Sequence, residues 1–186
     1  MKIKPFAVEE WMNAWEVGAK YNIAETCVDS ISMNELFELT GEDKTEFLNR
    51  LCARRLSYGD IEGLPEFRKG VCGLYKTLNI ENIVPTHGAS GANHHVFYSL
   101  ISPGVVSIMP TYQQLYSIPE SYGADVQILH LSKENNYLPD LEKLRRLVTP
   151  KTKMICINNP NNPTGALMSE QMLREIKQEI ERRKNL

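Results

Sequence analysis

Residues 154–165 read MICINNPNNPTG, an apolar run that passes directly into a polar loop. The first four residues, 154–157, are apolar and partly β-branched, which is typical of a buried strand. Ser169 is a suitable N-cap for the amphipathic stretch that follows, so the loop joins a strand to a helix. Its two prolines fix their own φ angles and restrict the preceding residues, while Gly165 tolerates φ values that other residues avoid. A stiff, amide-rich loop at the carboxyl end of a strand is suited to hold a polar ligand.

Composition is that of an ordinary globular chain. The 186 residues are 42% hydrophobic and 24% charged, enough for one domain with a sizeable core, and the net charge of −2 argues against nucleic-acid or acidic-membrane partners. No apolar run approaches the roughly 20 residues that span a bilayer, and the N-terminus lacks an apolar signal core, so a cytoplasmic location is expected. The four cysteines lack CxxC spacing, so neither a metal site nor disulfides are expected.

The first half of the chain is predicted to be helical. Ser32 and Glu35 are spaced as a capping box, and in the third helix Phe47, Leu48, Leu51 and Cys52 are expected to point inward. The expected helices cover residues 5–19, 33–39, 43–55 and 65–78.

The second half alternates between strands and helices. Strands are expected at residues 83–86, 105–109, 125–131 and 154–157. Helices are expected at 93–100, from 111 to about 122, after the N-cap Asp140, and from Ser169 to Leu186. Such alternation indicates an α/β fold with a mostly parallel sheet and right-handed crossovers.

Two further strand ends carry candidate binding residues. The glycine-rich turn at residues 87–93 leads into a helix, whose N-terminus favours an anion such as phosphate, although a plain tight turn explains the same residues. Tyr112 follows the second strand and could present its ring to a planar ligand, or it could belong to the core like most helical aromatics.

Together these stretches resemble class I/II aminotransferases, the fold-type I enzymes that use pyridoxal 5′-phosphate (PLP). Residues 159–165 resemble the Asn-Pro-x-Asn-Pro-Thr-Gly signature, and residues 58–68 resemble a Tyr-x-x-x-x-Gly-x-x-x-Leu-Arg segment with phenylalanine in place of leucine. The Gly-Ala-Ser at residues 88–90 and the Pro-x-Tyr at 110–112 also have counterparts in the family.

The resemblance implies a role for each candidate residue. The backbone of Ala89 and the hydroxyl of Ser90 would bind the cofactor phosphate, Tyr112 would stack on the pyridine ring, and Asn162 would hydrogen-bond the phenolic oxygen. Tyr58 would reach the cofactor phosphate of a neighbouring subunit, which implies a homodimer. The substrates would be an amino acid and a 2-oxo acid.

The resemblance also implies an incomplete enzyme. Residues 1–42 would be an N-terminal arm and small-domain segment, and residues 43–186 a partial PLP-binding large domain of fold type I. The lysine that forms the Schiff base, the aspartate and the substrate-binding arginine would lie beyond Leu186, so the fragment is expected to be inactive and no catalytic residue is assigned within it.

Other functions remain open at this point. PLP-dependent β-lyases, decarboxylases and amino-acid cyclases share the same phosphate cup and loop, because the fate of the α-carbanion depends on residues mostly outside this stretch. A non-catalytic ligand-sensing or dimerisation domain is a further alternative. Neither the substrate amino acid nor the reaction subtype follows from the sequence.

Overall fold

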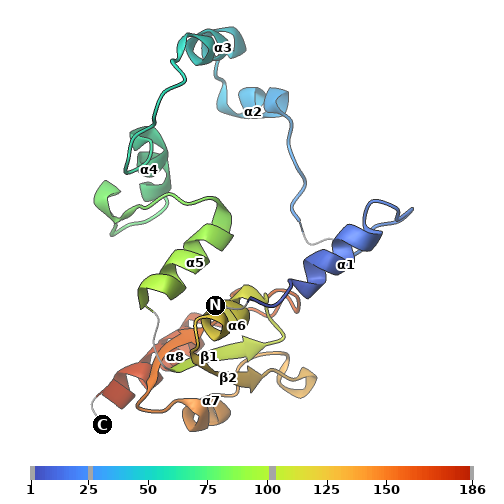
Figure 1. Cartoon of the computed structure of the whole chain (residues 1–186), viewed down its shortest axis with the longest axis vertical. Coiled ribbons are helices and arrows are strands. Elements are labelled where there is room, and N and C mark those ends of the chain that lie inside the picture. Colours follow the sequence, from blue (N-terminus) through green and yellow to red (C-terminus); the bar gives the residue numbers. More distant parts are fainter. Residues whose placement is uncertain (1–2, 25–26, 101–103, 185–186) are drawn as a thin grey trace. The chain divides into compact units, whose positions relative to one another are not determined.

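The computed structural model describes residues 3–24, 27–100 and 104–184 (Figure 1). The chain divides into two compact units, one formed by Met1–Glu10 with Thr86–Leu186 and the other by Trp11–Pro85. Helix α1 (Ala7–Trp15) runs from the first unit into the second.

The unit Trp11–Pro85 is helical, as the sequence predicts. Ser32 Oγ accepts the Glu35 N–H at 3.2 Å, and Glu35 accepts the Ser32 N–H at 2.6 Å, which forms the expected capping box and lowers the pKa of Glu35. Asp43 is the N-cap of the next helix, and its Oδ1 accepts the Glu46 N–H at 2.7 Å. The helices are α2 (Met33–Thr40), α3 (Lys44–Ala53), α4 (Pro65–Cys72) and the 3₁₀ turn η1 (Ile80–Asn82).

Two predictions for this unit are wrong. Leu48, Leu51 and Cys52 are exposed rather than inward. Among the described residues, the aromatic contact between α3 and another element is that of Phe37, which packs edge-to-face on Phe47 at 5.3 Å. Helix α4 ends at Cys72 rather than near residue 78, since Gly70 and Gly73 lower helix propensity at its end.

The other unit contains a three-stranded parallel sheet in the order β2-β1-β3. This confirms the α/β fold with a mostly parallel sheet. The strands are β1 (Gly104–Met109), β2 (Asp125–His130) and β3 (Thr152–Cys156). The helices are α5 (Gly88–Leu100), α6 (Gln114–Ser121), α7 (Leu141–Leu147) and α8 (Glu170–Lys184), with the 3₁₀ turn η2 (Lys133–Asn135).

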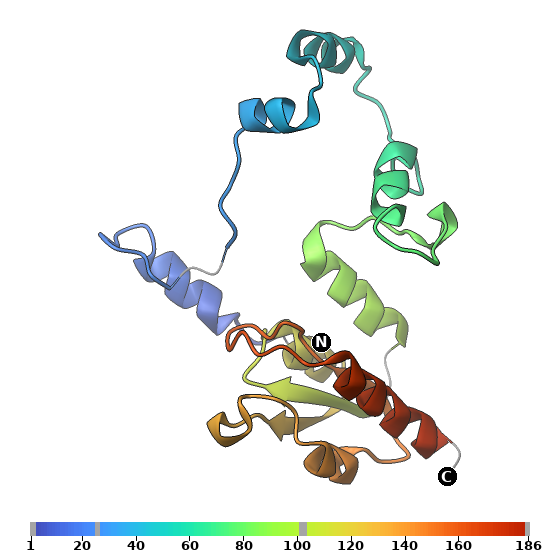
Figure 2. The same cartoon turned by 180° about the vertical axis from the view of Figure 1, so that it is seen from behind.

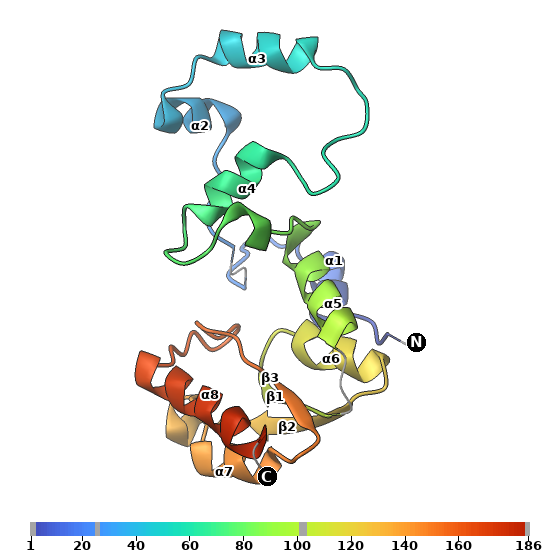
Figure 3. The same ribbon diagram turned by 90° about the vertical axis from the view of Figure 1, so that its left-hand side faces the viewer.

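Helices cover both faces of this sheet. On one face Val106 and Ile108 pack with residues of α7 and α8, including Leu144 and Ile176. On the opposite face Val105 packs with Phe97 of α5 and with apolar residues of α6. Figure 3 shows α6 on one side of the strands and α7 on the other, and Figure 2 shows α8 from behind. Because adjacent β1 residues point to opposite faces, one continuous apolar strand supports both layers.

The expected strand at residues 83–86 is absent, and this prediction is wrong. Val84 is exposed, and the Ile83 carbonyl accepts a hydrogen bond from Arg68 rather than from a neighbouring strand. A strand exists only when another strand pairs with it, and none of the three described strands lies beside this segment.

The helix expected to begin at Asn93 begins at Gly88 instead. Gly88 has φ +68°, which lets the chain turn sharply into the helix, and Ala89 and Ser90 then adopt helical geometry. The predicted glycine-rich loop is therefore the first helical turn itself.

None of the helices in the described ranges is both long and apolar enough to cross a membrane.

Candidate functional site

The candidate site lies where the sheet changes winding direction. After β1 the chain passes to α6 on one face, whereas after β3 it passes to α8 on the opposite face. The two connecting segments therefore diverge from neighbouring strand ends. In open α/β sheets a ligand binds in the crevice that such divergence leaves. The segments in question are residues 110–113 and 157–169.

Asparagine side chains fold the loop after β3 onto itself. Asn158 Oδ1 accepts the backbone N–H of Asn162 at 2.7 Å, and Asn159 Oδ1 accepts the N–H of Met168 at 2.8 Å. Gly165 has φ +69°, the left-handed conformation that the sequence led us to expect. These bonds satisfy backbone groups that a loop would otherwise leave without partners.

Asn161 ties this loop to the end of β1. It is 3% exposed, and its Nδ2 donates to the Pro110 carbonyl at 3.0 Å and to Thr164 Oγ1 at 2.9 Å. Its Oδ1 and the hydroxyl of Thr111 are buried without a hydrogen-bond partner. Buried polar atoms are nearly always paired, so these two mark a place where a polar ligand group or an ordered water fits.

Asn162 is the one asparagine of residues 158–162 whose side chain has no structural task. Its side chain is exposed, and the hydrogen bonds found among the described residues involve only its backbone N–H. Its amide group is therefore available to a ligand, which fits the residue predicted from the sequence.

We expect Asn161→Ala to lower the free energy of unfolding by about 1–3 kcal/mol, because it removes two hydrogen bonds from a buried group. Urea unfolding of the full-length protein measures the change. Asn162→Ala, the same substitution one residue away at an exposed position, is the control and should stay within about 0.5 kcal/mol of the native protein. Equal losses in the two variants would show that Asn161 does not hold the loop.

The start of α5 has the features that favour an anion. Ala89 and Ser90 are exposed, and the first turn of the helix contains no acidic residue. The backbone N–H groups at its start have no intrahelical acceptor, and the helix dipole adds about half a positive charge there. An anion bound at this end would be stabilised by both effects.

Gln114 connects the start of α5 to the start of α6. Its Nε2 donates to Ser90 Oγ at 2.7 Å, and its Oε1 accepts from Asn93 Nδ2 at 3.1 Å. This orients the Ser90 hydroxyl as an acceptor from Gln114 and leaves its own hydrogen available to donate.

Along the chain, Tyr112 lies between two residues that are hydrogen-bonded to other segments. Pro110, two residues before it, is bonded to Asn161, and Gln114, two residues after it, is bonded to Ser90. The ring of Tyr112 is half-buried. Through these two hydrogen bonds the segment that carries Tyr112 is connected both to the α5 start and to the loop that carries Asn162.

Tyr58, the fifth predicted residue, belongs to the other unit. Its relative exposure is 103%, and it lies on the segment Arg54–Asp60 between α3 and α4.

Three residues of the site were missed by the sequence reasoning. Gln114, Asn161 and Thr111 act through contacts between segments far apart in the chain, or through burial that no local pattern reveals. For Asn161 the sequence did contain a signal. Residues 158–162 include four asparagines, which is more side-chain amides than a turn requires.

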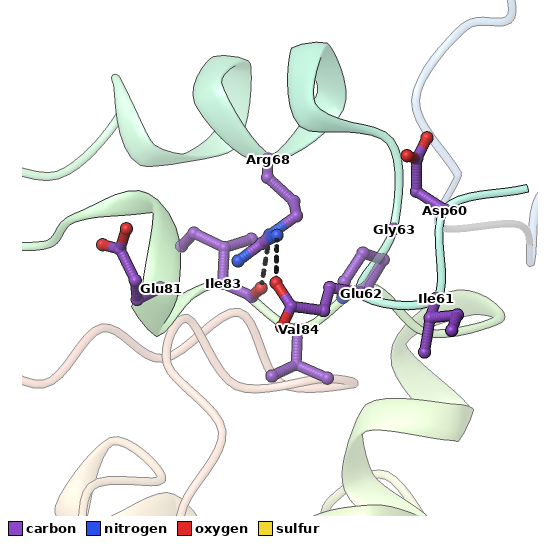
Figure 4. A pocket seen from close by; sticks show the side chains of 9 residues that line it. Asp60, Ile61, Glu62, Gly63, Arg68, Glu81, Ile83 and Val84 are labelled. Atoms are coloured by element: carbon purple, nitrogen blue, oxygen red, sulfur yellow. Dashed lines mark hydrogen bonds and ion pairs between the residues drawn. The ribbon is translucent and has the colours of Figure 1, made fainter.

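A polar hollow in the unit Trp11–Pro85 surrounds Arg68, but it is structural (Figure 4). Arg68 is 8% exposed; its Nε donates to the Ile83 carbonyl at 3.2 Å and its Nη2 to the Ile80 carbonyl at 2.9 Å. Nη1 binds Glu62 at 3.0 Å. Since each guanidinium nitrogen makes a hydrogen bond, Arg68 holds the loop before α4 and the turn after it.

We expect Arg68→Lys to loosen this loop, because a single ammonium group cannot replace the planar guanidinium, which donates to two carbonyls and a carboxylate. The backbone N–H of Gly63, which donates to Asp60 at 2.9 Å, should exchange with solvent about tenfold faster, as expected when hydrogen bonds of about 1.4 kcal/mol in total are lost. Hydrogen exchange followed by mass spectrometry is the measurement. Lys69→Arg, on the next and exposed position of the same helix, is the control and should leave the exchange unchanged.

Residues 39–186 match the family described as aminotransferase class I and II. The chain belongs to this family. Among solved structures, a PLP-dependent aminotransferase from Streptococcus suis 89-1591 is 49% identical, with a TM-score of 0.93 over 98% of this chain and 50% of its own. The PLP-dependent cyclase OrfR is 25% identical, with a TM-score of 0.82 over 98% of this chain and 47% of its own.

A curated member of the aminotransferase family is also similar to this chain. A probable aspartate/prephenate aminotransferase from Thermus aquaticus is 31% identical over 137 residues, which cover 68% of this chain and 35% of that protein. The chain therefore spans about half the length of the solved structures it matches and about a third of this relative.

Proposed function

We propose that this chain is the N-terminal part of a PLP-dependent aminotransferase, which transfers an amino group between an amino acid and a 2-oxo acid. The observation that carries the proposal is the convergence of the α5 start, Tyr112 and the Asn162 loop at the switch point of the sheet, in a chain that belongs to the aminotransferase class I and II family.

The residues present fit PLP as the cofactor. The start of α5, with exposed Ala89 and Ser90 and no acidic residue in its first turn, suits the phosphate. The half-buried ring of Tyr112 suits the pyridine, and the uncommitted amide of Asn162 suits the phenolic oxygen. When bound, PLP would act as an electron sink for the α-carbon of the amino acid.

Each side chain then has a task of its own. The Ser90 hydroxyl, already oriented by Gln114, donates its hydrogen to the phosphate together with the backbone N–H of Ala89. Tyr112 shields one face of the ring from water. Asn162 donates an N–H to the phenolic oxygen, and the bonds of Asn158 and Asn161 keep its loop rigid.

We further propose a homodimer in which the exposed Tyr58 contacts the cofactor phosphate of the partner subunit. In this proposal residues 1–42 are an arm and small-domain segment, residues 43–186 are part of the large domain, and the Schiff-base lysine lies beyond residue 186. A cytoplasmic location stays a prediction of the sequence.

A cyclase is the second candidate, favoured by the similarity to OrfR. The aminotransferase ranks first, because the identity to the Streptococcus suis aminotransferase is 49% against 25% for the cyclase. The fate of the amino group distinguishes the two, since only an aminotransferase consumes a 2-oxo acid.

The test uses the full-length protein purified with PLP. We expect an absorbance band from bound cofactor that borohydride fixes to one lysine, and conversion of a 2-oxo acid to its amino acid with aspartate among the donors tried. No bound cofactor would refute the proposal, and bound cofactor without amino transfer would favour a lyase or cyclase. A fixed band of one cofactor per chain on residues 1–186 alone would refute the expected inactivity of this fragment.

A further inference from the structure

The segment Lys4–Ala7 is bound to the start of α6 by a two-way hydrogen bond. Gln113 Nε2 donates to the Pro5 carbonyl at 2.7 Å, and Gln113 Oε1 accepts the backbone N–H of Ala7 at 3.1 Å. One side-chain amide thus satisfies a donor and an acceptor of a segment more than 100 positions away in the chain. Within the proposed N-terminal segment of residues 1–42, we call Lys4–Ala7 alone the arm.

A second contact fixes the arm at the far end of α6. Lys4 Nζ lies 2.8 and 2.9 Å from the two carboxylate oxygens of Glu120. Both side chains are largely exposed, so this ion pair adds little energy, but it sets the direction in which the arm runs.

Between these contacts Phe6 packs on Tyr112. The ring centroids are 5.0 Å apart and the planes cross at 73°, an edge-to-face pair. Phe6 is half-buried, whereas every other residue from Ile3 to Trp11 is exposed. Of this stretch, then, only the phenylalanine is placed by packing, and it is packed on the proposed cofactor-stacking ring.

We propose that Phe6 is a positioning residue for Tyr112, and that the arm keeps the tyrosine ring in the orientation that a flat ligand needs. The inference rests on the proposed function. Tyr112 lies three residues after the end of β1, and the bond from Asn161 holds the backbone of Pro110 before it, whereas Phe6 is the ring that contacts the Tyr112 side chain. A pre-oriented ring loses less conformational freedom when the ligand stacks on it.

The coupling between the Phe6–Tyr112 contact and PLP binding must be reciprocal. If Phe6 raises the affinity for PLP through Tyr112, bound PLP raises the stability of the docked arm by the same factor. The Ala7 N–H reports on docking, because its hydrogen bond to Gln113 breaks when the arm leaves.

The experiment compares the full-length protein with its Phe6→Ala, Phe6→Leu and Phe6→Tyr variants. Val8→Ala is the matched control, since Val8 lies two residues away and is 60% exposed. The measurements are the affinity for PLP, the visible circular dichroism of bound PLP, and the exchange rate of the Ala7 N–H with and without PLP.

We expect about fivefold weaker PLP binding in Phe6→Ala and Phe6→Leu, the change that an aromatic pair supplies, together with an altered dichroic band. Phe6→Tyr should restore both, and Val8→Ala should match the native protein. PLP should slow Ala7 exchange about fivefold in the native protein and not in Phe6→Ala.

Unchanged affinity and dichroism in Phe6→Ala and Phe6→Leu would overturn the inference, as would tighter binding, which would mean that the arm obstructs the ring. If Phe6→Ala does not fold, Phe6→Leu decides, since it keeps most of the apolar volume. Absence of PLP binding by the native protein would instead refute the proposed function, so the two failures are distinguishable.

Discussion

Replacing Asn162 by alanine is expected to lower kcat/KM of the full-length protein for amino transfer by about 10²–10³-fold, the usual cost of removing one preorganised hydrogen-bond donor. The reason is that the four asparagines of residues 158–162 differ in their hydrogen bonding. Asn158, Asn159 and Asn161 hold the loop, while the Asn162 side chain makes no hydrogen bond within the part of the chain that the structure describes. Steady-state kinetics with an amino acid and a 2-oxo acid measure the effect.

Stability separates this effect from damage to the loop. Asn162→Ala should unfold at the same urea concentration as the native protein, whereas Asn161→Ala should unfold earlier, as argued above. An Asn162→Ala protein with native kinetics would remove Asn162 from the site.

Replacing Ser90 by aspartate is expected to weaken PLP binding by at least about 100-fold. The substitution places a carboxylate at the exposed first turn of α5, where the phosphate is proposed to bind, and like charges about 4 Å apart repel each other by about 4 kcal/mol near a protein surface. The same carboxylate is favourable to the helix itself, because it complements the dipole by about 0.3–1 kcal/mol. The affinity for PLP should therefore fall, while the free energy of unfolding should stay the same or rise.

Ser99→Asp is the matched control. Ser99 is exposed on the same helix, about 13 Å along the axis from Ser90, and near the end where a negative charge is unfavourable. It should bind PLP like the native protein and be slightly less stable. Equilibrium titration with PLP and thermal unfolding give both quantities, and equal binding by the two aspartate variants would place the phosphate elsewhere.

The sequence was most informative where structure is local. The capping box of Ser32 and Glu35 and the N-cap Asp140 depend on residues a few positions apart, and both were found as predicted. Gly165 adopts a left-handed φ, which a glycine tolerates. The β1, β2 and β3 runs were also predicted, because a short apolar run between turns is typical of a buried strand.

Predictions failed where a partner segment decides the outcome. Residues 83–86 have the composition of a strand, but a strand needs a neighbour to take its hydrogen bonds, and here the Ile83 carbonyl goes to Arg68. Leu48 and Leu51 have the pattern of a buried helix face, but a pattern shows only that a face is apolar and not whether anything covers it.

By itself the sequence determined the family and the parallel α/β arrangement, and it predicted four cofactor-binding residues of this unit, because these follow from local composition and from motifs a few residues long. Only the tertiary structure decided that Asn161 bonds to Pro110, that Gln114 joins Ser90 to α6, and that Phe6 packs on Tyr112. Those facts depend on contacts between segments tens to more than a hundred residues apart, and such contacts are chosen by packing and hydrogen bonding in three dimensions, which no local pattern encodes.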